Sequence, residues 1–150
     1  MPVTIRNATA REIPLLVEMM GEFYAESGYA LDETWAKAAF AALLGDESYG
    51  AAWIVGRDGE PAGYVVLTLR FSMEQGGLEG CIDDLFVRPD ARRRGLGRIL
   101  LETLLAECKR RRVLAVLVEV GRDNAAAQAL YESCGLHPRD DDRQTFVMRC

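Results

Sequence analysis

A chain of 150 residues can bury about two-thirds of its unfolded surface, and we expect a single domain over residues 1–150. Apolar residues make up 49% and charged residues 27% of the chain, as in ordinary soluble domains. The net charge of −5 argues against a nucleic-acid partner, because a phosphate backbone needs a basic binding face. Without a signal-like segment or a membrane-length apolar run, we expect a cytoplasmic protein with no membrane partner.

The cysteine and histidine content indicates free thiols and no metal site. The four cysteines are far apart and lack metal-ligand spacing: Cys81, Cys108, Cys134 and Cys150. His137 is the only histidine, so the sequence has too few histidines for a histidine metal centre and only one candidate for a Ser-His-Asp triad.

The first third of the chain predicts one strand and two helices. Residues 3–6 alternate as a strand. Thr9 and Glu12 form a capping-box pattern, which predicts a helix from about residue 10. Asp32 is a suitable N-cap for a second helix, and Gly45 is a suitable stop.

The remainder alternates strands and helices. Strands are expected at 51–56 and 62–71 around the hairpin signal Asp58-Gly59, and again at 81–87 after a loop at 72–78. A helix should follow Gly95, then a buried strand at 113–120, a helix ending near Gly135 and a final strand at 144–149. The whole predicts a mixed α/β domain.

The stretch Arg92-Arg93-Arg94-Gly95-Leu96-Gly97 stands between a strand and a helix. The free N–H groups of a helix's first turn and its dipole favour anions. Glycines at 95 and 97 remove Cβ atoms that would keep phosphate oxygens away, and the arginines supply planar donors. The stretch therefore predicts a pyrophosphate site.

Two motifs together resemble the Gcn5-related N-acetyltransferases (the GNAT superfamily). The first is Arg92-x-x-Gly95-x-Gly97, and the second is Asn124-x-x-Ala127-x-x-Leu130-Tyr131-x-x-x-Gly135. The resemblance implies an acyl-CoA N-acyltransferase fold, with a mixed, mostly antiparallel sheet of about six to seven strands and about four helices. It also implies that the strands at 81–87 and 113–120 splay apart around acetyl-CoA.

The resemblance places the cofactor along these motifs. The residues implied to bind acetyl-CoA are Leu85, Phe86, Val87, Arg92, Arg93, Arg94, Gly95, Leu96, Gly97, Arg98, Asn124 and Tyr131. Tyr131 matches the tyrosine that acts as general acid toward the departing thiolate. Asn124 is also a plain N-cap candidate, and both roles can hold.

The general base is less determined. Strand alternation puts Glu79, Cys81, Asp83 and Leu85 on one face and Asp84 on the other. By resemblance the base lies at position 81 or 83, so Asp83 is preferred, with Glu79, Glu119 or an ordered water as alternatives. Because such enzymes transfer the acetyl group directly, Cys81 is not expected to carry it.

The Asp83-Asp84 pair resembles the Glu-Asp pair of polyamine-type acetyltransferases. We expect an acceptor site of Asp83, Asp84, Tyr24 and Glu26; whether the turn at residues 140–142 reaches it stays open. The implied function is acetylation of a small cationic amine (a polyamine, amino-acid derivative or aminoglycoside-like molecule) by a homodimer. The alternatives are acetylation of a protein N-terminus or lysine, and a non-catalytic acyl-CoA sensor.

Overall fold

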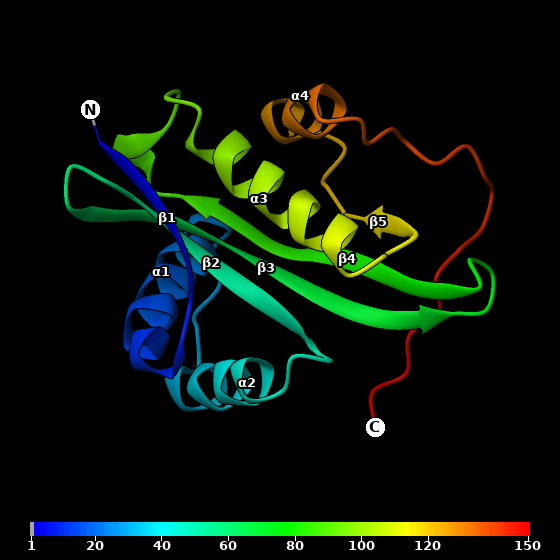
Figure 1. Ribbon diagram of the computed structural model, residues 1–150, viewed down its shortest axis with the longest axis horizontal. Coiled ribbons are helices and arrows are strands. Elements are labelled where there is room, and N and C mark those ends of the chain that lie inside the picture. The colour runs from blue at the N-terminus through cyan, green and yellow to red at the C-terminus, as the bar shows by residue number, and fades with distance from the viewer. Residues whose placement is uncertain (1) are drawn as a thin grey trace.

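The computed structural model describes residues 2–150 and consists of a twisted sheet with helices on both faces (Figure 1). The elements in chain order are β1 (Val3–Asn7), α1 (Ile13–Glu26), α2 (Glu33–Gly45), β2 (Gly50–Arg57), β3 (Glu60–Ser72), β4 (Gly77–Val87), α3 (Leu96–Arg110), β5 (Ala115–Leu117) and α4 (Ala125–Ser133). Short 3₁₀ turns at Ala10–Glu12 and Pro89–Ala91 precede α1 and α3. The expected mixed α/β fold is confirmed.

The strands lie side by side in chain order, β1-β2-β3-β4-β5. The first four pair antiparallel, and β5 joins β4 in parallel after the crossover through α3. Asp58 and Gly59 have φ of 53° and 81° at the β2–β3 turn. Positive φ at both positions is what a two-residue hairpin needs, so the Asp-Gly prediction is confirmed.

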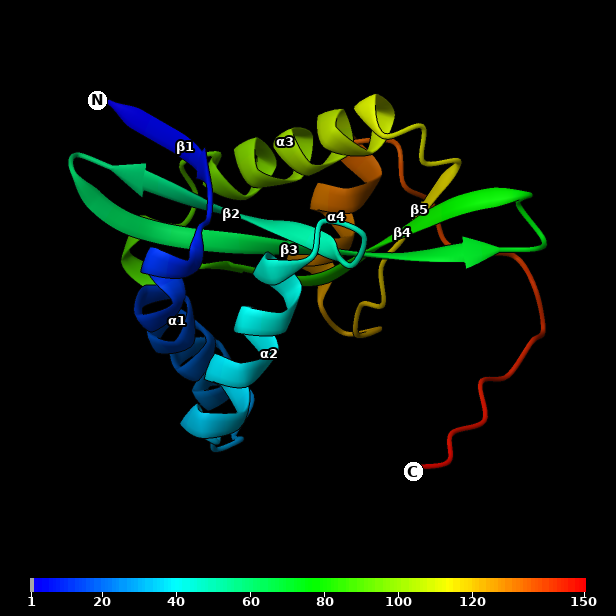
Figure 2. The same cartoon turned by 60° about the horizontal axis from the view of Figure 1, so that its bottom comes forward.

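The sheet separates two apolar clusters, with α1 and α2 packed on one face and α3 on the other (Figure 2). Alternate residues of β3 point to opposite faces: Tyr64 and Val66 toward α1 and α2, Val65 and Leu67 toward α3. Because β3 is covered on both sides, it reads as a continuous apolar run.

A β-bulge in β4 shifts the alternation in the middle of the expected site. Val66 of β3 pairs with Asp84, but the next residue, Leu67, pairs with Ile82, so Asp83 has no partner across the strand. Ile82 therefore packs on the α3 side, whereas Phe86 packs on the α1 side. The expectation that Glu79, Cys81 and Leu85 share one face is wrong, because the extra residue reverses the pattern beyond it: Leu85 packs with Ile82 on the α3 side, opposite Asp84, which bonds to Tyr64.

Strands β4 and β5 stay together for only three residue pairs, from Glu79–Ala115 to Cys81–Leu117. Beyond Cys81 the edge of β4 that faces away from β3 has no pairing with β5. The expected splay is confirmed, while the strand expected at 113–120 is shorter because residues 118–120 have left β4.

The strand expected at 144–149 is absent from the described residues, so the sheet has five strands rather than six or seven. Residues 137–150 run across the β3–β4 turn, where Arg143 Nη1 lies 3.1 Å from Glu74, and then lead away from the body (Figure 1). Phe146, Val147 and Met148 are exposed. Alternation predicts a strand only where an edge is available for pairing. Within residues 2–150 no helix is long and apolar enough to cross a bilayer.

Candidate active site

The arginine-glycine turn forms the start of α3. Gly95 is the N-cap with φ of 78°, and Arg93 also has a positive φ of 63°. A Cβ on Gly95 would meet no atom within 4 Å, so glycine is required there for its backbone conformation and the space beside it is open. The first α3 amides have no intrahelical acceptor, which suits them to an anion.

Gly97 has a packing role beside the expected one at the anion site, which stays a prediction. A Cβ at this position would lie 3.3 Å from Cδ2 of Leu130 on α4. The missing side chain therefore lets α3 and α4 approach closely. Gly95 therefore allows the backbone turn before α3, and Gly97 allows α3 to pack closely against α4.

The side chain of Arg92 points back toward α1. Its Nε donates to the carbonyl of Val87 at 2.8 Å, and its Nη2 lies 2.7 Å from both carboxylate oxygens of Glu26. Its guanidinium carbon also lies 5.8 Å from the ring centroid of Phe86. Arg92 and Glu26 were expected to bind the cofactor and the acceptor respectively. The structure pairs the two side chains with each other, and their roles toward cofactor and acceptor stay predictions.

The other arginines of the turn differ in how they are engaged. Arg98 bonds to Glu102 at 2.6 Å and to Ser133 at 3.0 Å, which ties α3 to α4. Arg93 and Arg94 are exposed, and neither takes part in a salt bridge among residues 2–150. These two side chains are the ones available to a polyphosphate.

The C-terminal end of β4 presents main chain rather than side chains to the splay. Leu85, Phe86 and Val87 pair with β3 through one edge. The Phe86 side chain is buried, with its ring centroid 5.5 Å from that of Phe23. Because β5 has diverged, the opposite edge of these residues has no strand partner and can pair with an extended ligand, apart from the Val87 carbonyl, which accepts from Arg92.

Carboxylates and tyrosines gather on the α1 side of the bulge. Tyr64, which is fully buried, donates its hydroxyl proton to Asp84 Oδ2 at 2.9 Å. Burial raises the pKa of Asp84, although the Tyr64 hydrogen bond partly offsets this. Burial and then Glu119 raise the pKa of Asp83. Burial, followed by Asp84 and Asp83, raises the pKa of the Tyr24 hydroxyl. Asp83, Asp84 and Tyr24 therefore lie together, as predicted, and Tyr64 joins them.

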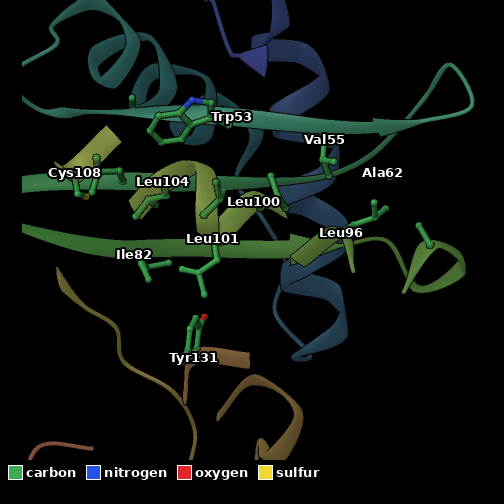
Figure 3. Close-up of a cluster of buried hydrophobic side chains, with 14 residues drawn as sticks. Trp53, Val55, Ala62, Ile82, Leu96, Leu100, Leu101, Leu104, Cys108 and Tyr131 are labelled. Atoms are coloured by element: carbon green, nitrogen blue, oxygen red, sulfur yellow. The ribbon is translucent and has the colours of Figure 1, made fainter. Parts of the chain in front are cut away.

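Tyr131 lies on α4 and packs into the α3-side core, below Ile82 and with its hydroxyl directed toward Leu101 (Figure 3). Burial raises the pKa of this hydroxyl, so it keeps its proton at neutral pH. Asn124 accepts a 3.1 Å hydrogen bond from the amide of Ala127 and is the N-cap of α4. The capping role of Asn124 is confirmed.

Two cavities adjoin the splay. A cavity of about 630 Å³ lies between α4 and residues 116–120 and is lined in part by Tyr131. A second, of about 270 Å³, lies where β4 and β5 separate; we call it the fork pocket. Its walls come from β3, β4, the end of β5 and Arg139: Thr68, Leu69, Arg70, Glu79, Gly80, Cys81, Leu117, Val118, Glu119 and Arg139.

The structure excludes one expected segment from the two cavities and adds two residues that the sequence did not indicate. The turn at residues 140–142 lines neither cavity, although Asp141 lies 3.6 Å from Arg139. Tyr64 and Arg139 were missed because a buried tyrosine reads as core and an arginine before an acidic run reads as surface. Among the described residues, no cluster of His, Cys, Asp or Glu side chains is arranged to hold a metal ion.

Comparison with known proteins points to one family. The model of the acetyltransferase (GNAT) family matches residues 15–136. A crystallised integron cassette protein from the mobile metagenome of Cole Harbour Salt Marsh is 40% identical, with a TM-score of 0.88 over 97% of this chain and 91% of that one. A predicted acetyltransferase from Clostridium acetobutylicum, crystallised with acetyl-CoA, is 16% identical, with a TM-score of 0.80 over 97% of this chain and 96% of its own, and shares the fold.

A curated relative matches over a shorter region. The [ribosomal protein bS18]-alanine N-acetyltransferase of Salmonella typhimurium is 49% identical over 59 residues, which is 39% of this chain and 40% of the relative. The chain thus spans less than half the length of that relative.

Proposed function

Because the chain belongs to the GNAT acetyltransferase family, we propose that it transfers the acetyl group of acetyl-CoA to the primary amine of a small cationic acceptor. The observation that carries this proposal is the pair Asp83 and Asp84. Both carboxyl groups have a raised pKa, and both lie where β4 leaves β5, on the strand that leads into the anion-binding turn.

The residues of the turn fit the cofactor. The amides at the start of α3 and the exposed Arg93 and Arg94 suit a pyrophosphate, and the open edge of β4 at residues 85–87 suits the extended pantetheine arm. Acetyl-CoA supplies an activated thioester. Arg92 supports the turn through Glu26 and the Val87 carbonyl, so the phosphate contacts fall to main-chain groups of residues 93–98 and to the free arginines.

A base is needed because an alkylamine is almost fully protonated at neutral pH. With an amine pKa near about 10.4, exposing the lone pair costs about 4–5 kcal/mol. A carboxylate whose pKa is raised by burial is a stronger proton acceptor than an ordinary aspartate. Asp83, on the bulge and more exposed than Asp84, takes the proton directly or through a water. Asp84 is held by Tyr64 and attracts the ammonium group.

The reaction also needs a donor for the developing negative charges. A main-chain N–H on the open edge of β4 can stabilise the oxyanion that forms when the amine attacks. Tyr131 keeps its proton because burial raises its pKa, and it is the side chain proposed to protonate the departing thiolate.

A protein N-terminus is the second candidate acceptor. The relative in Salmonella typhimurium that matches part of the chain is named a [ribosomal protein bS18]-alanine N-acetyltransferase. Such an acceptor also presents a primary amine, so the same carboxylates can receive it.

The test is release of CoA thiol from acetyl-CoA with a panel of small amines, amino acids and alanine-initiated peptides. Turnover with small amines is expected, with Asp83→Asn lowering kcat by about 100-fold. Asp58→Asn is the matched control, because Asp58 lies in the distant β2–β3 turn and asparagine accepts its positive φ. Tight acetyl-CoA binding without turnover on any acceptor would indicate a sensor and overturn the proposal. Turnover with peptides alone would favour the second candidate.

A further inference from the structure

We propose that the fork pocket binds the carboxylate end of a zwitterionic acceptor, so that the small amine acetylated by this protein is an amino acid or a derivative with a free carboxylate. The inference rests on the proposed function and narrows its substrate class. It follows from the pocket's size, its paired charges of both signs and its position beside Asp83.

The volume of the fork pocket sets the size of its ligand. At about 270 Å³ it lies below the range of about 300–1,000 Å³ typical of pockets for drug-sized molecules. A whole aminoglycoside, or several residues of a protein terminus, is too large to be enclosed in such a space. A single amino acid does.

The charges around the pocket are mixed rather than uniformly acidic. The buried Glu79 is already neutralised, since Arg70 Nε donates to its Oε1 at 2.7 Å. That leaves the exposed Glu119, which forms no salt bridge within residues 2–150, as the anion of the lining, and Arg139, loosely paired with Asp141, as its remaining cation. The contact of Arg139 Nε with Asp141, at 3.6 Å, is beyond hydrogen-bond reach.

A ligand with one positive and one negative group matches this arrangement best. A polyamine that entered the pocket would place a second cation against Arg139 and Arg70, and a dicarboxylate would meet Glu119. A zwitterion places its carboxylate on the planar donors of Arg139 and its ammonium group toward Glu119.

The lining of the pocket ends two residues before the proposed base on β4. Cys81 forms part of its wall and lies two residues before Asp83 on β4. Burial raises the pKa of Asp83 and of the Cys81 thiol most; the charge of Glu119 adds to both shifts, for Cys81 after that of Asp83. An amino acid whose carboxylate contacts Arg139 therefore has its amine on the side of Asp83, while the protonated Cys81 is a neutral wall.

The test compares acceptors that differ only in the carboxylate. CoA release is measured with methionine against 3-(methylthio)propylamine and with phenylalanine against phenethylamine. The amino acid of each pair should have a kcat/KM at least about tenfold higher. Arg139→Gln should lower kcat/KM by about tenfold for the amino acids and leave the decarboxylated amines unchanged. Arg143→Gln is the control, since Arg143 follows on the same segment but contacts Glu74 away from the pocket.

Each outcome bears on the inference. Equal or better turnover of the decarboxylated amines overturns it and leaves the proposed function standing. An equal loss for both members of a pair in Arg139→Gln also overturns the carboxylate contact. Acetylation of peptides alone excludes a free amino acid, and failure with every acceptor despite acetyl-CoA binding defeats both proposals.

Discussion

The hydroxyl of Tyr64 on β3 donates a 2.9 Å hydrogen bond to Asp84 on β4, inside the layer covered by α1 and α2. This contact exists only because the bulge at Asp83 turns Asp84 to the same face as Tyr64. It holds a carboxylate of raised pKa in a fixed position without neutralising it.

Replacing Asp84 by asparagine should stabilise the fold while reducing activity. The folded state binds the Asp84 proton more tightly than the unfolded chain does, because its pKa is raised on folding. Stability from this group is therefore present below the ordinary aspartate pKa of about 3.9 and is lost as pH rises through the raised value. Asp84→Asn removes this loss and can still accept the Tyr64 hydrogen bond.

The expected result is a higher melting temperature than wild type at pH 7, with the difference shrinking toward pH 4, and a kcat lower by about tenfold. Thermal unfolding across this pH range and CoA release at pH 7 measure both effects. A variant less stable than wild type at neutral pH would show that the Tyr64–carboxylate bond outweighs the cost of burying the charge.

Tyr131→Phe should reduce turnover far more than cofactor affinity. The phenol is nearly buried and its raised pKa keeps it protonated, so the change removes a proton donor and little packing. A fall in kcat of about 10- to 100-fold with unchanged acetyl-CoA affinity is expected. Tyr49→Phe, at a tyrosine that is 56% exposed, should change neither quantity. Wild-type turnover in Tyr131→Phe would remove this residue from the mechanism.

Gly95→Ala should weaken the turn without a steric clash. Alanine at φ of 78° costs about 1–2 kcal/mol of stability, while its Cβ meets no atom within 4 Å. Urea unfolding should show this loss, and calorimetry should show weaker acetyl-CoA binding. Gly95→Asn, which tolerates the left-handed conformation, should lose less of both. Equal losses in the two variants would mean that the added side chain, rather than φ, is responsible.

Arg92 and Glu26 should behave as a modest structural pair. Their side chains are 43% and 40% exposed, so the coupling in a double-mutant cycle of Arg92→Gln and Glu26→Gln is expected at about 0.2–1 kcal/mol. Acetyl-CoA affinity should fall less in Arg92→Gln than in Arg93→Gln. If Glu26→Gln instead tightens acetyl-CoA binding, the released Arg92 is itself a phosphate ligand.

Local sequence patterns were enough to predict the order of the elements through α4 and the position of the arginine-glycine turn. Those features depend on local rules: the Asp32 cap, the Asp58-Gly59 hairpin and the glycine before α3 are set by backbone geometry over a few residues. Both acetyltransferase motifs could be recognised in the sequence because they too are local patterns of a few residues.

Tertiary structure decided what those motifs do with their side chains. Strand alternation could not reveal the bulge, because the extra residue shows only in the register between β3 and β4. Nor could it show that Arg92 meets Glu26, or that Arg139 and Glu119 line the same pocket, since each pair joins segments distant in the chain. The segment at 144–149 had the right alternation, but a strand also needs an edge to pair with, and β5 spans only three residues.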